Sequence, residues 1–198
     1  MSRARHFFAL VSLICLGAMT LACETGSASR SQNSNVNSNR SDRPMSESTQ
    51  LTEVDRTFAG KATTGGKHEV ELGRIAAQQA SNADVKAFAN RMVQDHSKAG
   101  DELMQITNRL GVTVPSQDDP SFSQMRDNLA KLKGAEFDRA YMNEMVDGHT
   151  KVASDFESYL NTGTNADLKS WTSKTLPTVR EHLQMAKDVA AKVGAKVK

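Results

Sequence analysis

The chain contains few cysteines, prolines and aromatic residues, and each shortage bears on the class of protein that the sequence can encode. Only two cysteines and four prolines occur among 198 residues, and aromatic residues make up 5% of the sequence. Few prolines and aromatics, together with plentiful alanine and methionine, favour a helical protein. The formal net charge is only +2, and Arg3 and Arg5 in the first segment account for it. The sequence therefore lacks the basic surface of a nucleic-acid-binding protein, and that class is excluded.

The signatures of common enzyme classes are also missing. The sequence contains no glycine-rich phosphate loop and no nucleophile elbow. No cysteine follows Cys23, so catalysis by a thiol nucleophile is excluded. A Ser/His/Asp triad has no supporting local context. We identify no catalytic residue and no motif for an organic cofactor, and the sequence favours a non-catalytic protein.

Residues 1–22 are typical of a bacterial export signal of the lipoprotein type. Two arginines precede an apolar run from Phe7 to Leu21, which ends in small residues. The sequence "TLAC", ending at Cys23, resembles a lipobox, although Thr20 stands where leucine is usual. The alternative is ordinary cleavage nearby. A lone exported cysteine is easier to explain as a lipid anchor than as a structural residue. We therefore expect lipidation at Cys23 and no disulfide in the mature chain.

Residues 23–49 are rich in serine and asparagine and contain almost nothing to bury, which predicts a disordered tether. The folded domain is then expected to occupy residues 50–198. These predictions place the domain on the periplasmic side of the cell envelope, anchored to the outer membrane through Cys23. A membrane is the only partner that the sequence indicates.

From Leu51 onward, apolar residues recur at the spacing of three and four that predicts helices. The predicted helices cover residues 51–80, 83–110, 122–131, 135–160 and 165–193. Gly65 and Gly66 predict a kink or a close packing point in the first helix. Pro177 is expected to kink or break the last helix, because its ring clashes with the preceding turn. Gly134 is expected to end the short third helix.

The two halves of the chain resemble each other. "NADVKAF" (residues 82–88) opens the second predicted helix, and "NADLKSW" (residues 165–171) opens the last one. Further along, "VQDH" ending at His96 matches "VREH" ending at His182, with three extra residues around Pro177. The same logic aligns "HEVELG" at His68 with "HTKVAS" at His149. The pattern predicts a duplicated helical hairpin, and two such hairpins bury their apolar faces as an antiparallel four-helix bundle.

Each main helix carries one ionisable residue on its apolar face. These residues are Glu69, His96, His149 and His182. At about 1.5 Å of helix rise per residue, the four fall in a similar layer of the bundle. Imidazoles and a carboxylate that converge inside a bundle are typical metal ligands. Asp95 and Glu181, each just before a histidine, are expected to orient the ring nitrogens. The alternative is a buried network in which Glu69 pairs with protonated histidines.

The metal itself is left open among copper, zinc, iron and manganese. Met92, Met145 and Met185 lie one turn from the three histidines, and thioethers beside imidazoles would suit Cu(I). The alternative is that these methionines fill gaps in the core. His68 is expected to approach the site only if the first helix kinks, and Glu71 is expected to be solvated.

Three motifs of the chain resemble a known bacterial family. They are "EVELGRIAAQQASNADVKAFANRMVQDHSKA", "LKGAEFDRAYMNEMVDGH" and "LKSWTSKTLPTVREHL", in this order between Phe58 and Ala186. They are similar to the uncharacterised predicted outer membrane proteins, a domain of unknown function in the ferritin-like superfamily. The resemblance implies a ferritin-like four-helix bundle and an envelope location. It implies no biochemical activity.

Ferritin-like di-iron proteins use a Glu-x-x-His motif on two of their helices. In this chain the residues three before His96 and His182 are Val93 and Val179, and the third main helix contributes His149 instead of a glutamate. A mononuclear site of three histidines and Glu69, or no metal, fits the sequence better than a di-iron centre.

Three functions follow from these observations. The first is an envelope lipoprotein that binds a transition metal through the His/Glu layer, in metal sequestration or envelope stress. The second is a redox enzyme built on the same layer, with an open metal position. The third is a structural or interaction module whose histidines form a pH-sensitive network.

Overall fold

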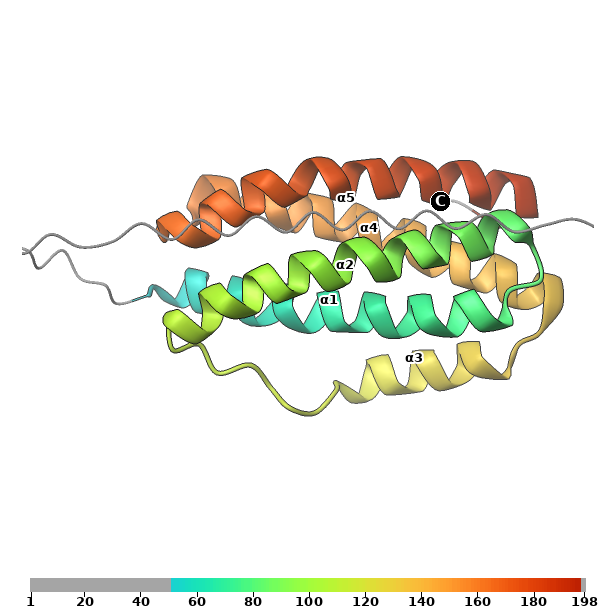
Figure 1. The fold of residues 1–198 in the computed structure, drawn as a ribbon, viewed down its shortest axis with the longest axis horizontal. Coiled ribbons are helices and arrows are strands. Elements are labelled where there is room, and N and C mark those ends of the chain that lie inside the picture. Colours follow the sequence, from blue (N-terminus) through green and yellow to red (C-terminus); the bar gives the residue numbers. More distant parts are fainter. Residues whose placement is uncertain (1–50, 197–198) are drawn as a thin grey trace, which may run out of the picture. The chain divides into compact units, whose positions relative to one another are not determined.

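Residues 51–196, the part of the chain that the computed structural model describes, form five α-helices (Figure 1). The helices are α1 (Glu53–Gln79), α2 (Ala83–Arg109), α3 (Pro120–Lys131), α4 (Gly134–Thr162) and α5 (Ala166–Val193). The predicted export signal, the tether and the lipidation site at Cys23 lie outside the described residues. None of the helices in the described range has the length and apolar character needed to cross a membrane.

Side chains at the helix starts explain where most of these helices begin. Thr52 accepts a hydrogen bond from the backbone of Asp55, whose carboxylate accepts one from the backbone of Thr52, so α1 opens with a reciprocal capping box. The side-chain oxygens of Asn82 and Asn165 accept hydrogen bonds from backbone N–H groups in the first turns of α2 and α5. These caps satisfy backbone N–H groups that have no partner within the helix. Gly134 begins α4 at a φ of 56° instead of ending α3, because glycine tolerates this left-handed conformation.

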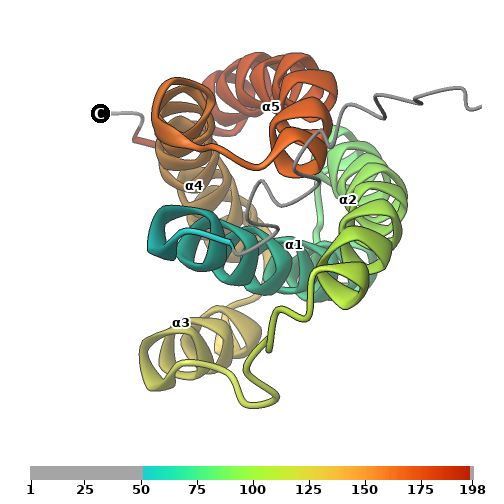
Figure 2. The ribbon, with the colours of Figure 1, turned by 90° about the vertical axis from the view of Figure 1, so that its left-hand side faces the viewer.

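The four long helices form two hairpins that pack into one bundle. Helix α1 pairs with α2 and α4 pairs with α5, while α2 also packs on α5 and α1 on α4. Viewed from one end, the helices therefore follow the order α1, α2, α5, α4 around the bundle (Figure 2). Helix α3 lies outside this ring and packs against α1 and α4. The predicted fold class, an all-α four-helix bundle of two hairpins with a short extra helix, is confirmed.

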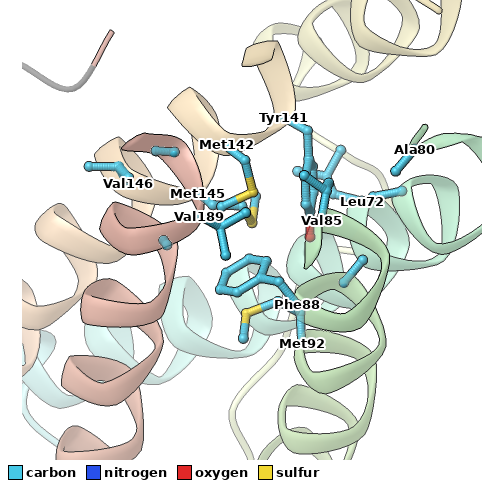
Figure 3. Close-up of a cluster of buried hydrophobic side chains, with 14 of the residues drawn as sticks. Leu72, Ala80, Val85, Phe88, Met92, Tyr141, Met142, Met145, Val146 and Val189 are labelled. Carbon is cyan, nitrogen blue, oxygen red and sulfur yellow. The ribbon is translucent and has the colours of Figure 1, made fainter. Parts of the chain in front are cut away.

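Two apolar clusters fill the bundle. The first includes Phe88, Met142 and Met145, whose side chains point toward one another near the α1–α2 turn (Figure 3). The second surrounds Phe58 and Trp171 toward the opposite end. Along each long helix the predicted polar layer falls between the two clusters, so its side chains are held between two blocks of apolar packing.

Two predicted irregularities leave their helices continuous. Helix α1 runs through Gly65 and Gly66, and α5 continues through Pro177. A Cβ on Gly65 or Gly66 would have no atom within 4 Å, so these glycines are not a close packing point.

A pair of buried aspartates joins the two hairpins. Asp55 of α1 accepts hydrogen bonds from the backbone N–H groups of Thr164 (3.0 Å) and Asn165 (3.2 Å) in the α4–α5 turn. Asp138 of α4 accepts hydrogen bonds from the N–H groups of Ser81 and Asn82, both at 2.9 Å, in the α1–α2 turn. Each hairpin therefore caps the turn of the other hairpin.

These capping contacts define the internal repeat. The numbers of Asp55 and Asp138 differ by 83, as do those of Asn82 and Asn165. The ends of α1 and α4 and the starts of α2 and α5 keep the same difference. The counterpart of His149 in the first hairpin is therefore Gly66, and the predicted alignment with His68 is out of register. His96 and His182 differ by three residues more, in line with the extra residues predicted around Pro177.

Candidate metal centre

Three histidines from three different helices converge in the polar layer. His96 of α2, His149 of α4 and His182 of α5 have ring centroids 5.3 to 5.5 Å apart. One nitrogen from each ring can be chosen so that all three lie within 4.8 Å of one another. His149 and His182 are each 1% exposed. The repeat accounts for two of the rings, since His96 and His182 occupy matching positions on the second helix of each hairpin.

The hydrogen bonds of two rings determine which nitrogen is free. His149 donates from Nδ1 to the carbonyl oxygen of Met145 at 2.9 Å, and this leaves a lone pair on Nε2. His182 donates from Nε2 to the carboxylate of Asp95 at 3.0 Å, and this leaves a lone pair on Nδ1. The two remaining nitrogens, together with Nε2 of His96, are buried and have no hydrogen-bond partner among the described residues. Leaving three such atoms unpaired is costly unless a ligand binds them.

Burial keeps the three rings neutral. Burial, followed by the neighbouring His149 and His182, lowers the pKa of His96 to about 3. Burial also lowers the pKa of His149 to about 4 and lowers the pKa of His182. Neutral imidazole is the form that binds metal ions. The alternative network of protonated histidines paired with Glu69 has no such ion pair in the described part of the chain.

Asp95 contacts His182 of the second hairpin instead of the adjacent His96. Its carboxylate accepts a hydrogen bond from His182 and another from Arg91, one turn earlier on α2. Burial alone would raise the pKa of Asp95, but these two donors lower it below its ordinary value. A carboxylate behind a ligand imidazole fixes the ring and increases its basicity. Glu181 has a different partner, since it is exposed and pairs with Arg91 at 3.8 Å.

Glu69 lies beside the cluster but outside the group of converging nitrogens. Its Oε2 is inaccessible to solvent and has no hydrogen-bond partner among the described residues. The other oxygen faces α4, where a Cβ placed on Gly148 would lie 3.5 Å from it. Burial, followed by the charge of Glu144, raises the pKa of Glu69 to about 8. Its carboxyl group is therefore mostly protonated at neutral pH and resembles the buried acids found in functional sites.

Two residues near Glu69 belong to a different cluster. His68 stacks on Phe122 of α3 with ring centroids 3.4 Å apart and contacts Asp118 at 3.3 Å. Glu71 pairs with Arg126 of α3 at 3.0 Å instead of being fully solvated. These contacts attach α3 to α1 and point away from the histidines. The sequence does not predict this role, because the pairing of α3 with α1 carries no periodic signal.

The methionines considered as copper ligands belong to the core. Met92 and Met145 are buried in the first apolar cluster, where Figure 3 shows them close to Phe88. Met185 packs on the edge of the same cluster. Their positions favour the interpretation that they fill space among apolar side chains.

The three free nitrogens suit a transition metal ion. Metal–imidazole bonds of about 2.0 Å in a tetrahedral site place the nitrogens roughly 3.3 Å apart. Nitrogens chosen one from each ring lie within 4.8 Å of one another, so each ring would move inward by about an ångström or less. Neutral imidazoles bind zinc, copper, iron and nickel, and they are poor ligands for magnesium and calcium. The buried His96/His149/His182 cluster can therefore hold one transition metal ion.

The fold and this cluster define an all-α bundle domain with a buried three-histidine centre. The sequence identifies its family: residues 40–189 match the family described as a domain of unknown function, DUF4142, and the chain belongs to it. No curated protein sequence matches the chain.

Solved structures of another group share the fold. A DUF305 fragment from Deinococcus radiodurans superposes with a TM-score of 0.63 at 12% identity, over 72% of this chain and 98% of that chain. A DUF305 protein from Streptomyces coelicolor, inferred to be secreted, superposes with a TM-score of 0.60 at 16% identity, over 70% and 91% of the two chains. At these identities the similarity establishes the bundle and carries no conclusion about the site.

Proposed function

We propose that this protein binds one transition metal ion in the cell envelope, with His96, His149 and His182 as ligands. The observation that carries the proposal is the convergence of three histidine side chains, each of which has one buried and unpartnered ring nitrogen. Hydrogen bonds already select the free nitrogen on His149 and His182, so the rings need little reorganisation to bind metal. The ion would satisfy all three atoms at once.

Glu69 is proposed as an additional ligand or as a neighbour of the bound ion. Its Oε2 atom is buried and has no hydrogen-bond partner among the described residues, and a nearby cation would favour the ionised form. Three protein ligands with a fourth position available are typical of reactive zinc sites, whereas closed structural sites use four. The donor set supports a mononuclear centre, since the buried cluster offers three imidazoles and no bridging carboxylate pair.

The role we propose for the bound ion is sequestration, with the envelope as the site of action. The sequence pattern at Cys23 supports a lipid anchor, and residues 24–49 support a tether. The Streptomyces coelicolor structure, inferred to be of a secreted protein, is compatible with an exported domain. Replacement of Cys23 by serine is expected to move the protein from the membrane fraction to the soluble fraction. Retention of the Cys23→Ser protein in the membrane fraction would show that the anchor lies elsewhere.

Metal titration tests the central claim. We expect the purified chain to bind one equivalent of Zn²⁺, Cu²⁺ or Co²⁺ in isothermal calorimetry, and Co²⁺ to give the visible spectrum of a four- or five-coordinate site. The His149→Ala variant is expected to lose this binding, because His149 is buried and supplies one of the three lone pairs.

A matched control uses a histidine outside the cluster. His68 stacks on Phe122 and lies in the α1–α3 contact, so His68→Ala is expected to bind the metal as the wild type does. Equal loss of binding in the His68 and His149 variants would indicate a general effect on folding. Undiminished binding in His149→Ala would contradict the assignment of the site.

A further inference from the structure

A cavity of about 400 Å³ opens within the bundle next to the histidine cluster. All four long helices line it, and most of the lining is apolar, including Phe58, Leu103, Phe156 and Trp171. Gly66 also lines the cavity, and the polar residues in its wall include Glu69 and His96. Pockets of a few hundred Å³ with apolar walls and a few polar groups are the usual shape of small-molecule sites.

The internal repeat explains why there is space beside the cluster. Gly66 is the counterpart of His149, as the spacing of the capping aspartates shows. A Cβ placed on Gly66 would have no atom within 4 Å. A bundle with full two-fold symmetry would carry a fourth imidazole here. In this chain the fourth position is open and belongs to the cavity.

Two residues that line the cavity carry buried polar atoms. Oε2 of Glu69 and Nε2 of His96 both lack a hydrogen-bond partner among residues 51–196. A hydroxyl group suits this place because it donates one hydrogen bond and accepts others, whatever the protonation state of Glu69. The aromatic walls favour a ring or a chain behind the hydroxyl.

We propose that the cavity binds a small apolar alcohol or phenol, with its hydroxyl group at Gly66 and Glu69. When a metal ion is bound by the three histidines, the hydroxyl oxygen takes the coordination position that the missing fourth histidine leaves open. The second statement rests on the proposed metal site, and the first does not. If the cavity binds such an alcohol or phenol, the cavity has a function and is not a packing defect.

The test uses 4-butylphenol as the probe and butylbenzene as a control of the same shape without the hydroxyl. Trp171 lines the cavity and is the one tryptophan of the chain, so its fluorescence reports occupancy. In the metal-free protein we expect 4-butylphenol to bind about tenfold more tightly than butylbenzene, the effect of one hydrogen bond to a buried polar group. Glu69→Gln is expected to reduce this preference, and Gly66→Leu is expected to abolish binding by filling the space.

Gly60→Leu is the matched control, because Gly60 is also a helical glycine with open space around it but does not line the cavity. This variant should bind 4-butylphenol as the wild type does. Absence of 4-butylphenol binding to the metal-free wild type, or equal binding to the Gly66→Leu protein, would overturn the proposal.

The Co²⁺-loaded protein tests the link to the metal. A change in its visible spectrum on addition of 4-butylphenol, absent with butylbenzene, is expected if the hydroxyl becomes a ligand. An unchanged spectrum despite Trp171 quenching would overturn the placement at the metal. Phenol binding without any Co²⁺ binding would support the cavity site and contradict the metal centre, so the two proposals fail separately.

Discussion

At the scale of single residues, the site depends on carboxylates in different environments. Asp95 is ionised and holds His182 through a hydrogen bond at 3.0 Å. Glu69 is buried without a hydrogen-bond partner among the described residues, and its pKa is raised to about 8. Asp95 therefore orients the imidazole of His182, while Glu69 keeps its proton beside the cavity.

Replacement of Asp95 by asparagine is expected to weaken metal binding by about 10- to 100-fold, the usual effect of losing the carboxylate behind a ligand imidazole. The amide can still accept a hydrogen bond, so the bundle should remain folded. Competition with a chromophoric chelator measures the affinity, and circular dichroism checks the fold. Glu181→Gln is the control, because Glu181 pairs only with Arg91 at 3.8 Å. A similar loss in both variants would argue against a specific role for Asp95.

The proton on Glu69 predicts a loss of stability as the pH rises from 6.5 to 8. The folded state holds this proton up to a pKa of about 8, whereas the unfolded chain releases it near 4.5. Below pH 6.5 the histidines oppose this effect, so the free energy of unfolding should fall with rising pH only above that value, by at most about 1.4 kcal/mol per pH unit. Glu69→Gln removes the titrating group and should flatten this decline, as urea denaturation of the metal-free protein at several pH values would reveal. A wild-type curve that does not fall between pH 6.5 and 8 would contradict the buried, protonated state.

At the scale of elements, the closeness of α1 and α2 depends on one glycine. A Cβ on Gly73 would lie 2.8 Å from Cγ2 of Val93 and 3.1 Å from the carbonyl oxygen of Ala89. The backbones approach each other here, directly beside the first apolar cluster. A side chain of any size would force the two helices of the hairpin apart.

Gly73→Ala is therefore expected to destabilise the protein by roughly 1–3 kcal/mol, the usual cost of overpacking a core. Gly60→Ala provides the opposite case, since its Cβ would meet no atom within 4 Å. That change should stabilise α1 by about 0.5–1 kcal/mol, because alanine has the higher helix propensity. Thermal unfolding of the two variants measures both effects. If both variants were more stable than the wild type, helix propensity, and not the α1–α2 contact, would decide the outcome.

Helix periodicity was sufficient to predict the five helices and the layer of His96, His149 and His182. Intrahelical spacing is a local property, and two hairpins with apolar faces have few ways to pack. The partner of Asp95 was not predictable in the same way, because it depends on how α2 and α5 are rotated about their axes. The register of the repeat was missed in the first hairpin because Gly66 has no side chain to match His149. The cavity follows from that same missing side chain.

At the scale of the whole domain, the histidine cluster predicts an acid-sensitive bundle. The unfolded chain binds protons on its histidines near pH 6.5, whereas the folded protein holds His96 neutral to about pH 3 and His149 to about pH 4. The unfolded state binds more protons in this range, so stability is lost as the pH falls below 6.5, by up to roughly 1.4 kcal/mol per unit for each ring.

A metal ion should add stability throughout this range. At a free concentration about 1,000 times its Kd, an ion that binds only the folded state adds roughly 4 kcal/mol. Protons compete for the same nitrogens only below the low pKa values of the folded histidines, so the added stability should persist at pH 5. Differential scanning calorimetry with and without Zn²⁺ at pH 7.5 and pH 5 tests this. Loss of the Zn²⁺ stabilisation at pH 5 would contradict the low pKa values of the folded histidines.

The reciprocal aspartates have a consequence for the history of the molecule. A single ancestral hairpin that paired with a second copy of itself would use the same contact twice, with Asp55 and Asp138 as one residue. In such a homodimer every change appears on both sides of the axis, so the centre must be equivalent in both halves. Once two hairpins are encoded in one chain, a histidine can face a glycine. A homodimer of identical hairpins could not have the asymmetry between His149 and Gly66, which leaves three histidines in the centre and open space at the fourth position.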